Sequence, residues 1–288
     1  MISVVIPTYK RKDKLEMTLE SVLNQSIKDY EVIVIEDGSN DGTKEMVTEL
    51  RDTHKNLSYF YQTNKGPAAA RNQGISKAKG EIIAFTDDDC VVPRDWLERL
   101  LAGFKKHPEV VGVGGKLEAS EDELKKNVYA RYEKYMSLKA YGTGEKEVIG
   151  GFDCPAGGTN NLAYKKKVLV EVGGFDETFP VAAGEDADIK KRITDKGYKI
   201  LYLPLKVEHH QDYYFGGFLK QSYNRGIGSY HFQKKWSQPP TKLEIYKQML
   251  LLAIKSKFNL LVKPQKFFVL LDFIFQWQEY RGMLKHVS

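Results

Sequence analysis

Apolar and polar residues follow one another along this chain in two kinds of block, and the order of the blocks predicts the secondary structure. Short runs rich in valine and isoleucine, bounded by glycine, proline or acids, are typical of buried strands. They lie at Ile2–Ile6, Tyr30–Ile35, Leu57–Tyr61, Ile82–Phe85 and Val110–Val113. Between them, apolar residues recur at spacings of three and four, as on the buried face of a helix. Strands that alternate with helices predict an α/β fold with a mainly parallel central sheet flanked by helices.

The second half of the chain is less regular. A helix is predicted to begin at Glu185-Asp186, followed by two short strands at Lys199–Leu203 and Lys206–Glu208. A long helical pattern then runs from Phe215 to about Tyr230. Its apolar spacing of three and four is that of a helix with one buried face.

Pro239-Pro240 separates this pattern from the end of the chain. Two mainly apolar segments follow, Leu243–Val262 and Phe267–Leu284. Because proline interrupts helices, the sequence predicts one large domain over residues 1–236 and an amphipathic helical tail over 237–288.

The composition excludes several classes of protein. Of 288 residues, 42% are hydrophobic and 12% aromatic, which suffices for a sizeable core and is unlike a disordered chain. Cys90 and Cys154 lack the spacing of a metal site and suit a reducing compartment. Met1–Pro7 reads as a strand instead of a signal peptide, and it is not followed by the G-x-G-x-x-G of an NAD-binding fold. We therefore expect a cytoplasmic protein.

The net charge of +6 is unevenly distributed. Residues 190–288 carry 18 Lys and Arg against 6 Asp and Glu, whereas residues 1–189 carry 26 against 32. A basic end on an acidic body predicts an anionic partner surface. Since no nucleic-acid-binding motif accompanies these charges, a membrane is the better expectation.

Three consecutive carboxylates, Asp87, Asp88 and Asp89, directly follow the Ile82–Phe85 run. Ligands of open α/β sheets bind beyond the carboxyl ends of the strands. Carboxylates this close repel one another unless they are neutralised, and Mg²⁺ and Mn²⁺ prefer oxygen ligands. The alternative is a solvated acidic turn ahead of the helix near Pro93, and the triplet alone does not decide between the two.

Six short motifs occur in a fixed order along the chain. They are Pro7-Thr8-Tyr9-Lys10-Arg11, Glu36-Asp37-Gly38-Ser39, Gly66-Pro67-Ala68-Ala69-Ala70-Arg71-Asn72, the acidic triplet, Gly173-Gly174-Phe175-Asp176-Glu177 and Gly184-Glu185-Asp186. Together they resemble the inverting family-2 glycosyltransferases of GT-A fold, over about residues 1–235. The resemblance implies a GT-A (nucleotide-diphospho-sugar transferase) fold over 1–236, with a nucleotide-sugar-binding half at 1–115 and an acceptor half at 116–236.

The resemblance also implies which residues bind the nucleotide-sugar donor. These are Thr8, Tyr9, Arg11, Asp37, Arg71, Asp87 and Asp88. Thr8 and Tyr9 would line the base pocket, and Asp37 would accept a hydrogen bond from the base. Arg71 would approach the diphosphate, where a guanidinium gives charge-assisted hydrogen bonds. Without the resemblance, Asp37 reads as an ordinary turn residue and Arg71 as a surface charge on a helix.

The resemblance implies that Asp89 is a direct ligand of Mn²⁺ or Mg²⁺. The cation would neutralise the departing nucleoside diphosphate. His209, which follows a predicted strand, is the second candidate ligand. A strand-end histidine bonded to the backbone fits equally well, and spacing alone does not separate His209 from His210.

Glu185 and Asp186 are the candidate catalytic pair, and the family pattern places the base on Asp186. Inversion requires a base that deprotonates the acceptor hydroxyl as it attacks. A helix amino end keeps such a carboxylate ionised. An N-capping role for Asp186 is the simpler interpretation, and the two roles are compatible.

These residues predict a metal-dependent, inverting and non-processive transfer of a sugar, with UDP as the expected nucleotide. The acceptor would be a glycan precursor or a lipid-linked carrier, as in polysaccharide biosynthesis. Processive synthases carry Q-x-x-R-W, whereas Gln233-Lys234-Lys235-Trp236 is one residue short and lacks the arginine. The alternatives are a sugar-1-phosphate nucleotidyltransferase and a non-catalytic, membrane-attached sugar-binding protein. Homo-oligomerisation is left open.

The tail is expected to bind the inner face of the cell membrane as a peripheral anchor. Its longest apolar runs are far shorter than the roughly 20 residues that a span requires, so it would lie in the interface. In and just before the second segment, Gln265, Asp272, Gln276 and Glu279 fall on one stripe of a helix. The alternative is that both segments pack on the catalytic domain or on a second subunit.

Overall fold

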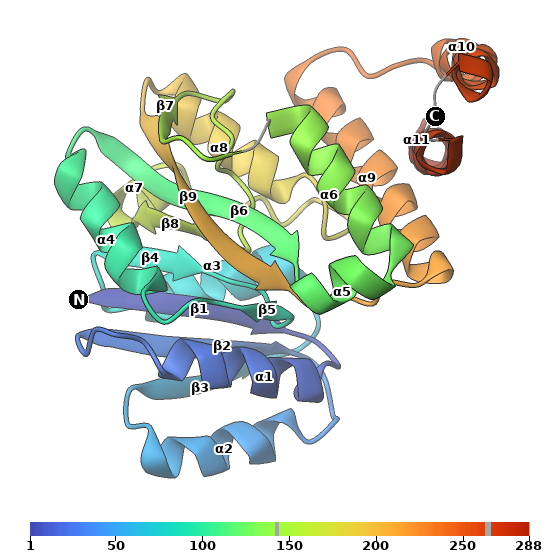
Figure 1. Ribbon diagram of the computed structural model, residues 1–288. Coiled ribbons are helices and arrows are strands. Elements are labelled where there is room, and N and C mark those ends of the chain that lie inside the picture. Colours follow the sequence, from blue (N-terminus) through green and yellow to red (C-terminus); the bar gives the residue numbers. More distant parts are fainter. Residues whose placement is uncertain (142–143, 263–265, 288) are drawn as a thin grey trace. The chain divides into compact units, whose positions relative to one another are not determined.

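The computed structural model describes residues 1–141, 144–262 and 266–287 (Figure 1). The strands are β1 (Ile2–Thr8), β2 (Tyr30–Asp37), β3 (Leu57–Gln62), β4 (Ile82–Phe85), β5 (Cys90–Val91), β6 (Val110–Ala119), β7 (Val148–Gly150), β8 (Leu162–Lys165) and β9 (Lys199–His209). The helices are α1 (Lys12–Leu23), α2 (Thr43–Thr53), α3 (Pro67–Lys77), α4 (Trp96–Lys106), α5 (Glu121–Lys126), α6 (Val128–Tyr141), α7 (Lys166–Glu171), α8 (Glu185–Asp195), α9 (Phe215–Trp236), α10 (Lys242–Val262) and α11 (Lys266–His286). By its contacts the chain divides into two compact units.

Unit 1 comprises Met1–Glu121, Ser137–Glu177 and Asp186–Gln211 and holds a single sheet. The strand order is β3-β2-β1-β4-β8-β6-β9-β5, with β7 paired to β9 (Figure 1). From β3 to β4 all neighbours are parallel. Beyond β4 the sheet is mixed, because β8 runs antiparallel to both of its neighbours while β6 and β9 are parallel. The predicted α/β class is thus confirmed, and the parallel part of the sheet is its N-terminal part.

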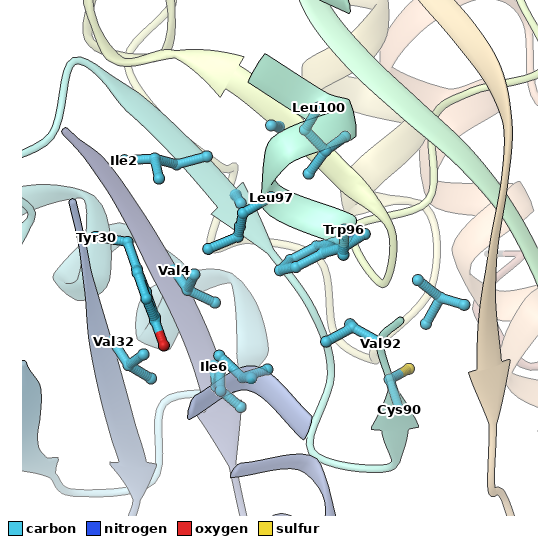
Figure 2. Packing of buried hydrophobic residues seen from close by; sticks show 14 of the residues in the cluster. Ile2, Val4, Ile6, Tyr30, Val32, Cys90, Val92, Trp96, Leu97 and Leu100 are labelled. Carbon is cyan, nitrogen blue, oxygen red and sulfur yellow. The ribbon is translucent and has the colours of Figure 1, made fainter. Parts of the chain in front are cut away.

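The core of unit 1 lies on both faces of the sheet. Successive side chains of a strand point to opposite faces, so Ile2, Val4 and Ile6 join one buried cluster and Val5 joins the other. Gly74 of α3 lies so close to Val5 that it leaves no room for a side chain. On the opposite face, side chains of β1, β2 and α4 pack together, as Figure 2 shows for Ile2, Val4, Ile6, Tyr30, Trp96, Leu97 and Leu100.

The prediction of two short strands between residues 199 and 208 is wrong, because β9 is one continuous strand. Its pairing with β6 shifts in register between Tyr202 and Lys206, where Pro204 lies. Proline has no backbone N–H for the ladder, so it produces an irregularity inside the strand instead of ending it. As a result β9 continues to His209, which pairs with Cys90 of β5.

Unit 2 comprises Asp122–Met136, Thr178–Glu185 and Asp212–Ser288. Its core is an aromatic cluster in which α11 packs on α9 and on the beginning of α6. The fully or largely buried members are Tyr132, Phe218, Leu271 and Phe275. α9 therefore groups with the two tail helices by its contacts, and the division at residue 236 stays a prediction.

The predicted polar stripe of the last helix faces this core. Asp272 accepts a hydrogen bond from the Tyr132 hydroxyl, 3.2 Å away. Burial raises the pKa of Glu279 to about 7, although the nearby Arg225 guanidinium acts in the opposite direction. Gln265 lies outside the described residues. α11 therefore uses its charged side for packing within unit 2.

None of the helices in the described ranges has both the length and the apolar content to cross a membrane.

Candidate active site

The parallel strands β1, β2 and β4 end at the same edge of the sheet, and each is followed by predicted site residues. Thr8 is the last residue of β1, Asp37 the last of β2, and Asp87 lies just after β4. This shared edge follows from the register, in which Thr8 is paired with Glu36 and Val5 with Phe85. The structure therefore brings together residues that are far apart in sequence.

Asp88 and Asp89 are buried, and Arg11 forms an ion pair with both of them. The Arg11 Nη1 atom lies 3.0 Å from Asp88 Oδ1 and 2.9 Å from Asp89 Oδ2. Thr8 donates a hydrogen bond to the other oxygen of Asp88 at 2.8 Å. The side chains of the two acids are only 6% and 5% exposed. A solvated acidic turn is thereby excluded.

Burial and charge act differently on these two neighbouring acids. Burial raises the pKa of Asp88 to about 6, against the opposing effect of the Arg11 charge. Burial also pushes the pKa of Asp89 upward, but His209 and then Arg11 outweigh it and hold the value at about 2. Asp89 is thus held as a carboxylate over the whole physiological range.

His209 is the histidine whose ring meets the triplet. Its Nε2 atom lies 3.4 Å from Asp89 Oδ1. The His210 ring instead approaches Glu208, at 3.7 Å, while its backbone N–H donates to the Asp89 carbonyl. The pairing of β9 with β5 therefore separates two residues that spacing did not.

Asp89 and His209 are the donors available for a divalent cation. Over the described part of the chain, no three His, Cys, Asp or Glu side chains form a group that could hold a metal by themselves. Mg²⁺ sites commonly use one or two carboxylates together with phosphate oxygens of the substrate, and imidazole is an acceptable ligand of Mn²⁺. The donors fit a cation that shares its ligands with a diphosphate.

Arg71 is a buried residue and not a surface charge. It is 4% exposed, and its Nη2 atom donates to Asp87 Oδ1 at 2.9 Å. Its guanidinium also lies over the Phe175 ring, 5.7 Å from the ring centre. Asp87 is 29% exposed, so the buried Arg71 is paired with an acid that is partly accessible at the sheet edge.

Asp37 holds the loop that precedes α3. One of its carboxylate oxygens accepts hydrogen bonds from Gln62 Nε2 at 2.7 Å and from the Lys65 N–H at 2.8 Å. The other accepts from the Gly66 N–H at 2.8 Å. Asp37 is thus a structural anchor at the predicted base pocket, where the exposed ring of Tyr9 also follows β1.

Glu36, its neighbour, was not singled out from the sequence. It is buried and accepts hydrogen bonds from the hydroxyls of Ser39 and Tyr59. Its place in the Glu36-Asp37-Gly38-Ser39 motif was the signal that could have found it.

Asp186 lies in the first turn of α8, where its Oδ1 accepts a hydrogen bond from the Ala187 N–H at 2.7 Å. α8 begins at Glu185, so Asp186 is the second residue of the helix and not its N-cap. Glu185, the first residue of α8, is buried and belongs to unit 2, whereas Asp186 opens a segment of unit 1.

Two buried polar groups near Asp186 were missed by the sequence analysis. Lys190, one turn further along α8, donates to the Cys154 carbonyl; burial lowers its pKa, and the nearby Asp186 charge opposes this. The Tyr164 hydroxyl is fully buried and finds no hydrogen-bond partner among the described residues, and burial raises its pKa. The spacing of four between Asp186 and Lys190 was the available signal for the lysine.

Asn160 and Asn161, just before β8, lie next to the acidic triplet and inside the fold, respectively. Asn161 is held inside the fold, because its side chain accepts from Trp96 Nε1 at 2.9 Å and donates to the carbonyls of Lys116 and Leu205. The backbone carbonyl of Asn160 accepts from Thr86, just before the triplet.

The chain is similar to several known proteins. Residues 3–169 match the model of glycosyl transferase family 2. The glycosyltransferase AglE of Haloferax volcanii is 31% identical over 230 residues, which are 79% of this chain and 72% of that protein. The glucosyl-dolichyl phosphate glucuronosyltransferase of the same organism is 26% identical over 61% of this chain and 56% of its own length.

Two solved structures share the fold at low sequence identity. The mannosyltransferase PcManGT from Pyrobaculum calidifontis, in complex with GDP-Man and Mn²⁺, aligns with a TM-score of 0.67 and 18% identity, over 99% of this chain and 86% of its own. GalNAc-T7 with UDP, GalNAc and Mn²⁺ aligns with a TM-score of 0.59 and 20% identity, over 81% and 49%. The predicted GT-A fold is confirmed by these neighbours.

Proposed function

Because this chain belongs to glycosyl transferase family 2, we propose that it transfers a sugar from a nucleotide-sugar to an acceptor hydroxyl with inversion at the anomeric carbon and with a divalent cation. One observation carries this proposal. The buried acids Asp88 and Asp89 meet Arg11 at the strand edge that Arg71 also reaches through Asp87. Such a cluster provides both oxygen ligands for a cation and guanidinium groups for a diphosphate.

The donor would bind with its base near Tyr9 and Asp37 and its diphosphate near Arg71. The Asp37 carboxylate accepts three hydrogen bonds, from Gln62, Lys65 and Gly66, so the pocket would be rigid before the nucleotide arrives. Preorganised sites of this kind lose less entropy on binding. We propose to test UDP first, and one structural neighbour was solved with UDP. GDP is the second nucleotide to test, because the other neighbour was solved with GDP-Man.

Asp89 and His209 would hold Mn²⁺ or Mg²⁺. A bound cation supplies positive charge that stabilises the leaving diphosphate. Arg11, which pairs with Asp88 and Asp89, would add positive charge next to the donor diphosphate.

Asp186 would act as the base. Its carboxylate would take the proton of the acceptor hydroxyl while the oxygen of that hydroxyl attacks the anomeric carbon from the face opposite the diphosphate. The new glycosidic bond forms as the bond from that carbon to the diphosphate breaks, and the configuration inverts. The buried Lys190 one turn away places a positive charge near the carboxylate, which favours its ionised form. Glu185 is the second member of the pair.

The acceptor would be a glycan precursor or a lipid-linked carrier, handled by a peripheral enzyme on the inner face of the membrane. The relative named for glucosyl-dolichyl phosphate supports a lipid-linked acceptor. A poly-β-1,6-N-acetyl-D-glucosamine synthase of Staphylococcus aureus, 28% identical over 71% of this chain, supports a glycan.

Binding of UDP and of GDP, measured by calorimetry with and without Mn²⁺, tests the metal assignment. Asp89→Ala should lose the Mn²⁺-dependent part of nucleotide binding and lose turnover, because it removes the acid that lies beside His209. Asp52→Ala removes the same charge from an exposed position of α2 and should change neither. Full turnover in excess chelator, or in Asp89→Ala, would overturn the metal-dependent reaction.

A further inference from the structure

Helix α10 carries apolar side chains on two opposite faces. Ile245, Met249 and Leu252 are buried, and α10 packs against α11. The other face presents seven large side chains, each between 57% and 76% exposed. They are Leu243, Tyr246, Leu250, Leu251, Ile254, Phe258 and Leu261. Six of them recur at spacings of three and four, and Leu251 borders that stripe, so they form one continuous face of the helix.

Four lysines lie on or beside this apolar face, residues 243–261 of α10. Lys247 and Lys257 lie among its apolar side chains, and Lys242 and Lys255 lie at its two edges. All four lysines are exposed. Glu244 is the acid of this helix, and it caps the helix start by accepting hydrogen bonds from Thr241.

α11 offers no face of this kind along its length. Its Leu271 and Phe275 are buried against α9 and α6, and its acids face the same core through Tyr132 and Arg225. Exposed large apolar side chains occur only near its start, at Phe267 and Leu270, among its described residues. The two tail helices therefore differ, and the exposed apolar surface belongs to α10.

A second copy of the chain fits this face poorly. The apolar pattern is symmetric about Leu252, so an antiparallel pair of α10 helices would place Leu243 opposite Leu261. The same symmetry would place Lys247 of each copy opposite Lys257 of the other. Like charges across an interface oppose association, whereas anionic headgroups would attract all four lysines.

We propose that the exposed apolar face of α10 lies flat on an anionic lipid bilayer, with its leucines and aromatic rings below the headgroups and its lysines among the lipid phosphates. Long lysine side chains reach back to the headgroups from such a position. Large exposed apolar patches mark sites of protein or membrane contact, and interleaved cationic residues select the membrane. This proposal rests on the peripheral membrane location given under the proposed function and names the surface that makes the contact. It does not depend on the transfer chemistry.

Flotation of the full chain with vesicles tests this surface. Vesicles of neutral phosphatidylcholine are compared with vesicles that also contain phosphatidylglycerol. Leu250→Ser together with Ile254→Ser should weaken binding to the anionic vesicles by about tenfold or more, since it removes two side chains from the centre of the face. Lys247→Gln together with Lys257→Gln should weaken binding to the anionic vesicles and leave the weak binding to neutral ones unchanged.

Val170→Ser is the matched control, because Val170 is 62% exposed on α7 and lies outside α10. It should float like the parent. Nucleotide affinity should be retained in every variant, which separates this proposal from the donor chemistry. Unchanged flotation of the double serine variant would overturn the proposal. So would a parent dimer that becomes monomeric in that variant while neither protein floats.

Discussion

Removal of the Arg11 guanidinium tests how the acidic cluster is neutralised. The Arg11 Nη1 atom lies 3.0 Å from Asp88 Oδ1 and 2.9 Å from Asp89 Oδ2, the carboxylate that we propose as a metal ligand. A cation that binds Asp89 must compete with this arginine for one carboxylate. In the absence of nucleotide, Arg11→Ala should therefore bind Mn²⁺ more tightly than the parent.

The size of the effect follows from the contact that is lost. A hydrogen bond to a charged group contributes about 1.5–3 kcal/mol. The Arg11 side chain is 46% exposed, so solvent screening brings its contact with Asp89 to the lower end of that range. About 1.4 kcal/mol corresponds to a tenfold change in dissociation constant. We expect roughly tenfold tighter binding of Mn²⁺.

The dissociation constant is read from the signal of free Mn²⁺ in electron paramagnetic resonance. A pH of 8 lies above the pKa of about 6 that burial gives Asp88. Lys10→Gln is the control, because it removes one charge from the same loop, where Lys10 lies over the Tyr9 ring. Equal tightening in Lys10→Gln would indicate a general charge effect. Unchanged or weaker binding in Arg11→Ala would refute competition between the arginine and the cation.

Two further substitutions test the base and unit 2. Asp186→Asn keeps the side-chain shape and the oxygen that accepts from the Ala187 N–H but removes the proton acceptor. Transfer should therefore slow by roughly 10²–10⁴-fold with donor affinity unchanged. A parallel loss of donor affinity, measured by calorimetry, would assign Asp186 a structural role. Burial raises the pKa of Glu279 from 4.5 to about 7, so its contribution to stability is complete below pH 4.5 and is lost as the pH rises through 7. In urea unfolding, Glu279→Gln should therefore gain about 3 kcal/mol relative to the parent between pH 4 and pH 8. Asp122→Asn, at an exposed acid of the same unit, should gain little, and parallel pH curves for Glu279→Gln and the parent would contradict the burial argument.

The strands of unit 1 and the position of the acidic triplet are predictable from sequence because both depend on local pattern. A strand such as Ile2–Thr8 is specified by its own side chains, and a polar residue after it must lie at the sheet edge. The family motifs then indicate which polar residues meet. The local pattern did not distinguish one irregular strand from two at Pro204, since the continuation of β9 depends on its pairing with β6.

Side-chain environments required the tertiary structure. Arg71 reads as a surface charge until α3 packs on β1 and β2, where Arg71 is buried beside Asp87. His209 and His210 are equivalent by spacing, and only the pairing of β9 with β5 directs one ring toward Asp89. Both cases depend on contacts between residues that are far apart in the chain.

The tail shows the same limit in another form. Both segments are apolar on most sides, so periodicity alone does not say which face is buried. In the structure, Gly226 of α9 and Gly282 of α11 allow a close helix contact. That contact turns Asp272 and Glu279 toward the core, while α10 keeps its apolar face exposed.

Product analysis tests the central claim most directly. The full chain is incubated with UDP-sugars and GDP-sugars, a lipid-linked glycan extract as acceptor and either Mn²⁺ or excess chelator, and the released nucleotide is identified by chromatography. The account predicts that a nucleoside diphosphate is released with Mn²⁺ but not with chelator, that its release falls with Asp186→Asn, and that the transferred sugar has the opposite anomeric configuration to the donor. Release of pyrophosphate, a product that retains the donor configuration, or no release from any donor would contradict it.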